Sequence, residues 1–119
     1  MSRGTFWRAV NDAADGIART FREEQNFRIQ LAVAAAACAA AVALRFSGQQ
    51  FAVLALTMGF VLACELLNTC LEHAIDLLAP EPNPIARAAK HAGAGAVLVS
   101  SIVAATVGVW LFGGAILGR

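Results

Sequence analysis

Three long runs of apolar residues limit what this chain can fold into. They cover residues 29–44, 51–78 and 92–118, and the last of them contains no charged residue. A helix of about 20 apolar residues crosses the hydrocarbon core of a bilayer, because each residue adds about 1.5 Å. Charged residues make up only 14% of the 119 residues, against about 25% in an average soluble domain. We therefore predict one all-α membrane domain, residues 1–119, with three transmembrane helices.

The bounds of the expected helices follow from the residues between the runs. We expect spanning helices at about 27–45, 50–78 and 88–114, and the prolines of "APEPNP" end the second one. Ahead of them, between residues 5 and 22, apolar side chains recur at three- and four-residue steps while charged side chains face away. This period predicts an amphipathic helix on the membrane surface, with Phe6 and Trp7 toward lipid.

The charges are distributed unequally across the predicted membrane. Three crossings place the N-terminal arm and the segment between the second and third spanning helices on the same side. Of the nine Lys and Arg residues, only Arg45 and Arg119 fall on the other side, and all eight acidic residues lie in the half of the protein that contains the N-terminal arm and this segment. By the positive-inside rule we expect that half to face the cytoplasm. The net charge of +1 gives no indication of a nucleic-acid partner.

A stripe of small residues follows one face of the third run. Such a stripe lets another helix approach closely and favours a tight bundle or an oligomer, although an alanine-rich membrane helix also contains small residues by composition alone. Its members are Gly93, Ala96, Ser100, Ala104 and Gly108.

The stretch "ACELLNTCLEHAID", residues 63–76, places three carboxylates where apolar side chains are expected. At about 100° per residue, Glu65, Asn68, Glu72 and Asp76 fall within a stripe less than about 90° wide. A charge near membrane depth costs at least a few kcal/mol unless it is paired, hydrated, protonated or bound to a metal. The stripe therefore predicts a functional site at the cytoplasmic interface.

The residue types of this stripe suggest particular chemistry. Stacked carboxylates without matching Lys or Arg favour a hard cation such as Mg²⁺, which commonly takes one or two carboxylates together with substrate phosphates. Glu65 is the deepest and suits a general base toward a lipid hydroxyl. Lys90, which we expect at the start of the third helix, can meet a phosphate with help from the first amides of that helix.

Other readings of the same stripe stay open. A proton or ion path, or a polar seam that only joins helices, would use the same residue types. Neither a Walker loop nor an H-E-x-x-H motif is present, which argues against the soluble nucleotide-binding folds and against a zinc hydrolase.

The stretches "EEQNFRIQL", "ELLNTCLEHAID" and "AKHAGAGAV" together resemble the small prokaryotic integral-membrane lipid kinases, diacylglycerol kinase and undecaprenol kinase. The family pattern is close to E-x-x-N-[ST]-A-[IL]-E-x-x-x-D followed by A-K-D-x-A-A-G-A-V, and the resemblance covers nearly the whole chain. It implies a homotrimer in the bacterial inner membrane, with composite sites between neighbouring subunits and the N-terminus and active site in the cytoplasm. The implied reaction transfers the γ-phosphate of ATP to a lipid alcohol, giving phosphatidic acid from diacylglycerol or undecaprenyl phosphate from undecaprenol.

The resemblance also implies roles for single residues. Glu65 matches the catalytic base, and Asn68 lies beside it at the lipid substrate. Glu24 and Glu72 match the carboxylates that hold Mg²⁺ with the nucleotide. The full set of expected nucleotide-binding residues is Arg8, Gly16, Glu24, Glu72, Asp76, Lys90 and His91.

One position departs from the family pattern. Where the family has Lys-Asp, this chain has Lys90-His91. A histidine cannot replace an anion as a partner of a metal or a ribose without rearrangement. The alternative is therefore a catalytically impaired relative that acts as a membrane oligomer binding lipid or nucleotide.

Overall fold

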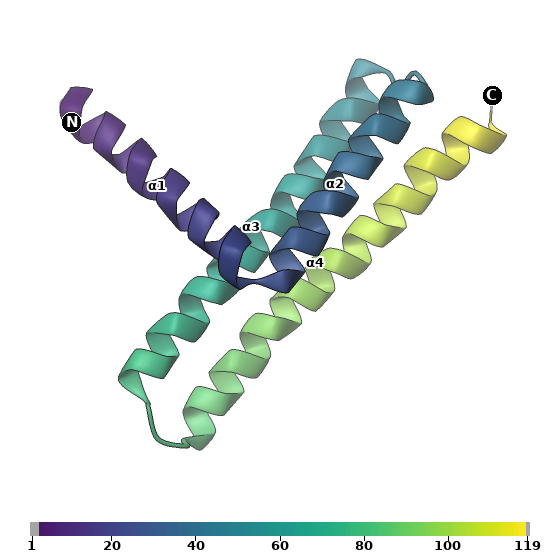
Figure 1. Ribbon diagram of the computed structural model, residues 1–119. Helices are drawn as coiled ribbons and strands as arrows, with labels where there is room; N and C mark the ends of the chain where they lie inside the picture. Colours follow the sequence, from purple (N-terminus) through teal and green to yellow (C-terminus); the bar gives the residue numbers. More distant parts are fainter. Residues whose placement is uncertain (1–2, 119) are drawn as a thin grey trace.

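The computed structural model describes residues 3–118, so the expected position of Arg119 lies outside the described residues. Within this range the chain forms four helices and no strand (Figure 1). They are α1 (Arg3–Glu23), α2 (Gln25–Ala43), α3 (Gly48–Leu78) and α4 (Pro84–Leu117). The predicted all-α fold class is confirmed.

Helices α2, α3 and α4 are each long and apolar enough to cross a membrane. With 19, 31 and 34 residues, they are about 28, 46 and 51 Å long at about 1.5 Å per residue. The hydrocarbon core of a bilayer is about 30 Å thick. The length of α2 therefore matches the thickness of the hydrocarbon core, whereas α3 and α4 are long enough to extend beyond it.

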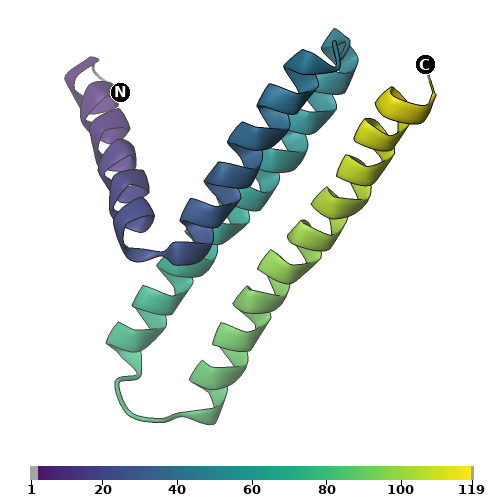
Figure 2. The same cartoon turned by 45° about the vertical axis from the view of Figure 1, so that its right-hand side comes forward.

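The three long helices form an elongated bundle from which α1 projects (Figures 1 and 2). α3 and α4 lie side by side and run antiparallel, and α2 packs along the N-terminal half of α3. A small apolar core forms near the α2–α3 turn and the end of α4. In it the centre of the Phe46 ring lies 4.9 Å from that of the Phe112 ring, and its buried members are Ala41, Phe46, Leu54, Leu111 and Ala115.

The start of α4 differs from the sequence-based expectation. Asn83 caps this helix by accepting hydrogen bonds from the amides of Ile85 and Ala86 at 2.9 and 3.1 Å, and Pro84 occupies its first turn. The helix thus begins at Pro84 rather than near residue 88, and Lys90 lies in its second turn. The expectation that the first amides of the helix assist Lys90 is therefore wrong, because the amides of Ile85 and Ala86 lie about one turn before Lys90 and already donate to Asn83.

A bend at Glu24 separates α1 from α2, and we call residues 20–28 the α1–α2 corner. Glu24 has an extended backbone, with φ of −112° and ψ of 111°. Its amide donates to the carbonyl of Thr20 at 2.8 Å, and Phe27 is buried with 2% of its surface exposed. In both views the corner lies beside the middle of α3 (Figures 1 and 2). The bend thereby brings Glu24 to the level of the acidic stripe.

Candidate functional site

The acidic stripe of α3 lies on a face of the helix that is buried in the bundle. The buried residues of α3 are Leu54, Val61, Glu65 and Thr69, which are separated by seven and four residues and so share one side of the helix. Glu65 is only 5% exposed. Its carboxylate therefore occupies a position that an apolar side chain would ordinarily fill.

Asn68 and Glu72 are joined one turn further along α3. The Asn68 side-chain amide donates to Glu72 Oε1 at 3.2 Å. The other polar atom of this side chain, Asn68 Oδ1, is buried and has no hydrogen-bond partner among residues 3–118. It faces Gly93 of α4, and a buried acceptor without a donor is unfavourable.

At the outer end of the stripe, Lys90 of α4 forms an ion pair with Asp76 of α3. Both side chains are partly exposed, 39% for Lys90 and 61% for Asp76. Ion pairs exposed to this extent contribute about 0–1 kcal/mol to stability. The pair therefore costs little to open, and Lys90 is able to exchange its carboxylate partner for a phosphate.

The α1–α2 corner supplies a third carboxylate to the site. Glu24 and Glu72 lie near enough to Glu65 to interact with it electrostatically. We call Glu24, Glu65 and Glu72 the carboxylate cluster. Glu24 is half-buried, and although it stands at the N-cap of α2 its side chain caps no amide.

The donors of this cluster fit a hard cation. Carboxylate and amide oxygens are the ligands that Mg²⁺ prefers, usually completed by water and phosphate oxygens. Between residues 3 and 118, no three His, Cys, Asp or Glu side chains are arranged to hold a metal ion by themselves.

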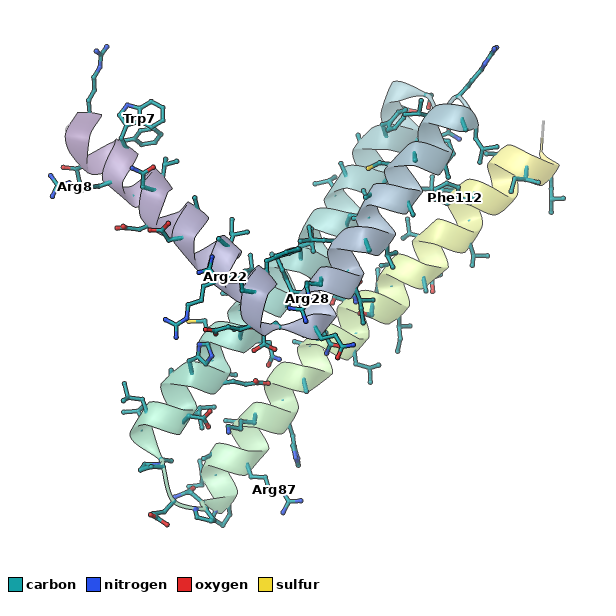
Figure 3. All side chains as sticks on the ribbon, in the orientation of Figure 1. Trp7, Arg8, Arg22, Arg28, Arg87 and Phe112 are labelled. Carbon is teal, nitrogen blue, oxygen red and sulfur yellow. The ribbon has the colours of Figure 1, made fainter. Side chains whose placement is uncertain are left out.

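Three predicted site residues lie apart from the carboxylate cluster. Arg8 is exposed near the outer end of α1, far along the helix from the corner (Figure 3). Gly16 lines a hollow of about 390 Å³ between α1 and a different part of the α3 surface, beside Thr69. His91 is exposed and lines an outer hollow with Arg87. The structure thus brings together Glu24, Glu65, Asn68 and Glu72, with the pair of Asp76 and Lys90 about one turn beyond Glu72.

Two further residues shape the site in ways that the sequence analysis did not identify. Arg28 Nη1 donates to the carbonyls of Phe21 and Arg22, at 2.7 and 3.0 Å, across the α1–α2 corner. Gly93 faces Asn68, and a Cβ at this position would collide with Asn68 Oδ1. The sequence indicates Gly93 only as one member of a small-residue stripe, and it contains no local signal for the Arg28 contact.

An apolar groove of about 300 Å³ lies between α2, α3 and α4. On α3 it is lined by Val61, Met58 and Leu54, which are one, two and three turns from Glu65. Ala34 and Ala37 of α2 and Ala104 and Gly108 of α4 form its opposite walls. The groove therefore begins about one helical turn, or about 6 Å, from the buried carboxylate and leads into the membrane-spanning part of the bundle.

Comparison with known proteins decides the family. The family model described as prokaryotic diacylglycerol kinase matches residues 11–112. This chain belongs to the prokaryotic diacylglycerol kinase family. The resemblance noted in the sequence is confirmed, and the protein is a multi-pass membrane lipid kinase. Every predicted site residue except Arg8 falls inside the matched range of the family.

Two relatives are similar to this chain in sequence. The undecaprenol kinase of Bacillus subtilis is 35% identical over 107 residues, which cover 90% of this chain and 87% of that protein. The diacylglycerol kinase of Synechocystis sp. is 40% identical over 94 residues, which cover 78% of this chain and 54% of that protein. The relatives thus act on two different lipid alcohols.

Proposed function

We propose that the protein transfers the γ-phosphate of ATP, with Mg²⁺, to the hydroxyl of a membrane lipid alcohol, and that undecaprenol is the preferred acceptor. The observation that carries the proposal is the position of Glu65. Glu65 is 5% exposed, about one helical turn from Asn68 on the same face of α3, and one turn from the end of an apolar groove. A hydroxyl carried on a long apolar chain suits these surroundings.

The acceptor side of the reaction uses Glu65 and Asn68. Glu65 takes the proton of the lipid hydroxyl as its oxygen attacks the γ-phosphorus, and Asn68 helps to orient that hydroxyl. The lipid O–P bond forms, the bond from the γ-phosphorus to the bridging oxygen of ATP breaks, and ADP leaves. The proton then passes from Glu65 to water, which returns the carboxylate to its starting state.

The nucleotide side uses the remaining carboxylates and Lys90. Glu24 and Glu72 would hold Mg²⁺ together with the phosphates, and the ion would neutralise the charge of the transferring phosphoryl group. Lys90 would leave Asp76 to contact a phosphate of the nucleotide. Phosphoryl transfer depends mainly on positioning and charge neutralisation, which these residue types provide.

The site faces the cytoplasm in this proposal, because most Lys and Arg residues flank that side of the three crossings. ATP is available there. We also propose a homotrimer, since Arg8 lies far from the carboxylate cluster of its own subunit (Figure 3). A neighbouring subunit would bring its own α1 to this site and complete the nucleotide-binding set.

One comparison favours undecaprenol over diacylglycerol. The match to the Bacillus subtilis undecaprenol kinase extends over 87% of that protein, whereas the match to the Synechocystis diacylglycerol kinase covers 54%. An apolar groove discriminates weakly between chains that differ by single methylenes, so we expect a preference rather than strict selectivity.

The test offers each lipid separately to protein purified in detergent, with ATP labelled at the γ-phosphate. We expect label to enter undecaprenol about tenfold faster than diacylglycerol, and no label to enter either lipid from ATP labelled at the α-phosphate. Faster labelling of diacylglycerol would reverse the assignment of the acceptor. Failure to label either lipid, with protein shown to be folded, would contradict the proposed reaction.

A further inference from the structure

We propose that Arg28 is a positioning residue: it locks the α1–α2 corner and thereby places the Glu24 carboxylate for metal binding. The proposal rests on the proposed function in one respect, namely that Glu24 is a ligand of Mg²⁺. The structural part, that Arg28 fixes the corner, stands on the contacts of Arg28 alone.

Arg28 lies in the first turns of α2 and reaches back to the end of α1 (Figure 3). Its Nη1 atom donates to the carbonyl of Phe21 at 2.7 Å and to that of Arg22 at 3.0 Å. These residues are seven and six positions earlier in the chain. One guanidinium group therefore joins the last turn of one helix to the first turns of the next.

The carbonyls that Arg28 binds are ones that a helix end leaves without partners. The last four carbonyls of an α-helix have no intrahelical donor. In α1, the carbonyl of Thr20 accepts a hydrogen bond from the amide of Glu24 at 2.8 Å. The next two carbonyls, those of Phe21 and Arg22, accept hydrogen bonds from Arg28. A cation at this end also interacts favourably with the helix dipole. The corner thus depends on Arg28 for two charge-assisted hydrogen bonds, which are stronger than neutral ones.

Glu24 stands between the two parts that Arg28 joins. Its backbone is held at the bend by the bond to Thr20. Its side chain caps no amide, and within the described residues no hydrogen bond or ion pair restrains its carboxylate. The backbone geometry of the corner therefore determines where this carboxylate points, and Arg28 stabilises that geometry.

The Arg28 guanidinium does not neutralise Glu24 in this arrangement. Its hydrogen bonds go to main-chain carbonyls, and no salt bridge between the two side chains occurs in the described part of the chain. The carboxylate of Glu24 is thus not paired with Arg28. Arg28 therefore acts on the position of Glu24 through the backbone and not by pairing with its charge.

The first arm of the test measures hydrogen–deuterium exchange in full-length protein in lipid nanodiscs. Arg28→Met keeps the apolar stem and removes the donors, so we expect exchange of the amides in residues 20–28 to rise about tenfold or more while that of α3 and α4 stays unchanged. Arg28→Lys retains a charged donor but lacks the planar fork of the guanidinium, so it should restore only part of the protection. Arg22→Met is the matched control, because it removes a charge from the same corner and leaves the Arg22 carbonyl in place.

The second arm measures metal binding directly. Mn²⁺ is titrated in the presence of a non-hydrolysable ATP analogue, and the bound fraction is followed by electron paramagnetic resonance. We expect about tenfold weaker Mn²⁺ binding in Arg28→Met, partial recovery in Arg28→Lys, and binding within about twofold of wild type in Arg22→Met. In lipid phosphorylation, Arg28→Met should raise the Mg²⁺ concentration for half-maximal rate by a similar factor.

The outcomes separate the parts of the proposal. Unchanged exchange in Arg28→Met would overturn the claim that Arg28 locks the corner. Faster exchange with unchanged Mn²⁺ binding would overturn the link to Glu24. If Arg28→Met does not fold, Arg28→Lys must still show intermediate protection and intermediate metal affinity, and wild-type values for both would contradict the proposal. A wild-type protein that phosphorylates neither lipid would refute the proposed function, while the exchange arm would still decide the role of Arg28 at the corner.

Discussion

Gly93 of α4 lies so close to Asn68 of α3 that no side chain fits between them. A Cβ at position 93 would collide with Asn68 Oδ1 and would stand 2.9 Å from Leu71 Cδ2. Asn68 is also the residue that donates to Glu72. The packing of two membrane helices and the geometry of the candidate site therefore depend on the same contact.

Gly93→Ala should lower both activity and stability, because the new methyl group displaces Asn68 and with it Glu72. Overpacking of this kind costs about 1–3 kcal/mol, and we expect phosphorylation to fall about tenfold or more. The measurements are the lipid phosphorylation rate and thermal unfolding in detergent. Gly95→Ala is the matched control, since no atom lies within 4 Å of a Cβ at that position. Equal behaviour of the two variants would show that the contact with Asn68 is unimportant.

Glu24→Gln tests the metal role of the carboxylate at the corner. Removal of one charge from the carboxylate cluster should raise the Mg²⁺ concentration for half-maximal activity about tenfold or more, because Mg²⁺ is bound by few protein carboxylates. The adjacent Glu23 provides the control: it forms an exposed ion pair with Arg19 at 3.0 Å, and loss of such a pair costs about 0.3–0.5 kcal/mol. Glu23→Gln should leave the Mg²⁺ dependence unchanged. A similar shift in both variants would rule out a specific role for Glu24.

Lys90→Met distinguishes a phosphate contact from a structural ion pair. Because the pair with Asp76 is partly exposed, we expect the free energy of unfolding to change by less than about 1 kcal/mol. The KM for ATP should instead rise about tenfold, since a charge-assisted contact to phosphate is lost. Arg87→Met removes a cation one turn earlier on α4 and should change neither quantity. A large loss of stability with an unaltered KM would mean that Lys90 serves the fold.

His91→Asp tests whether the departure from the family pattern impairs the enzyme. His91 is exposed and lies apart from the carboxylate cluster in its own subunit. Exposed substitutions usually change free energies by less than about 0.5 kcal/mol, so we expect the phosphorylation rate to change by less than about threefold. An increase of tenfold or more would show that the histidine restrains the reaction and that this chain is an impaired relative.

The spanning helices and the acidic stripe are predictable from the sequence, because both depend on local pattern. Hydropathy over about 20 residues identifies a membrane helix, and the helical period alone places Glu65, Asn68 and Glu72 on one face. The structure keeps this face together, with Glu65 buried and Asn68 bonded to Glu72.

The α1–α2 corner is not predictable in the same way. The stretch "FREEQNFR" contains neither Gly nor Pro, so no local signal marks a bend at Glu24. The bend is stabilised by burial of Phe27 and by the reach of Arg28 to carbonyls six and seven residues back. Both are tertiary effects, and propensity within a short window does not contain them.

The start of α4 is a different case, because its signal is present in the sequence. Asn followed by Pro is a typical beginning of a helix, with the side chain of Asn as cap and Pro in the first turn. The expected start near residue 88 follows apolar character instead, and so places the boundary at the membrane rather than at the cap. The cap at Asn83 shows that α4 starts before the apolar run does.

The most direct test of the site concerns Glu65. The substitution Glu65→Gln keeps the size of the side chain but removes the carboxylate that acts as the base. The variant and the wild type are compared in the transfer of the labelled γ-phosphate of ATP to undecaprenol. We expect the rate to fall by about 100-fold or more, as loss of a general base does, while binding of a non-hydrolysable ATP analogue stays within about twofold. Transfer at close to the wild-type rate by folded Glu65→Gln protein would contradict the assignment of Glu65 as the base.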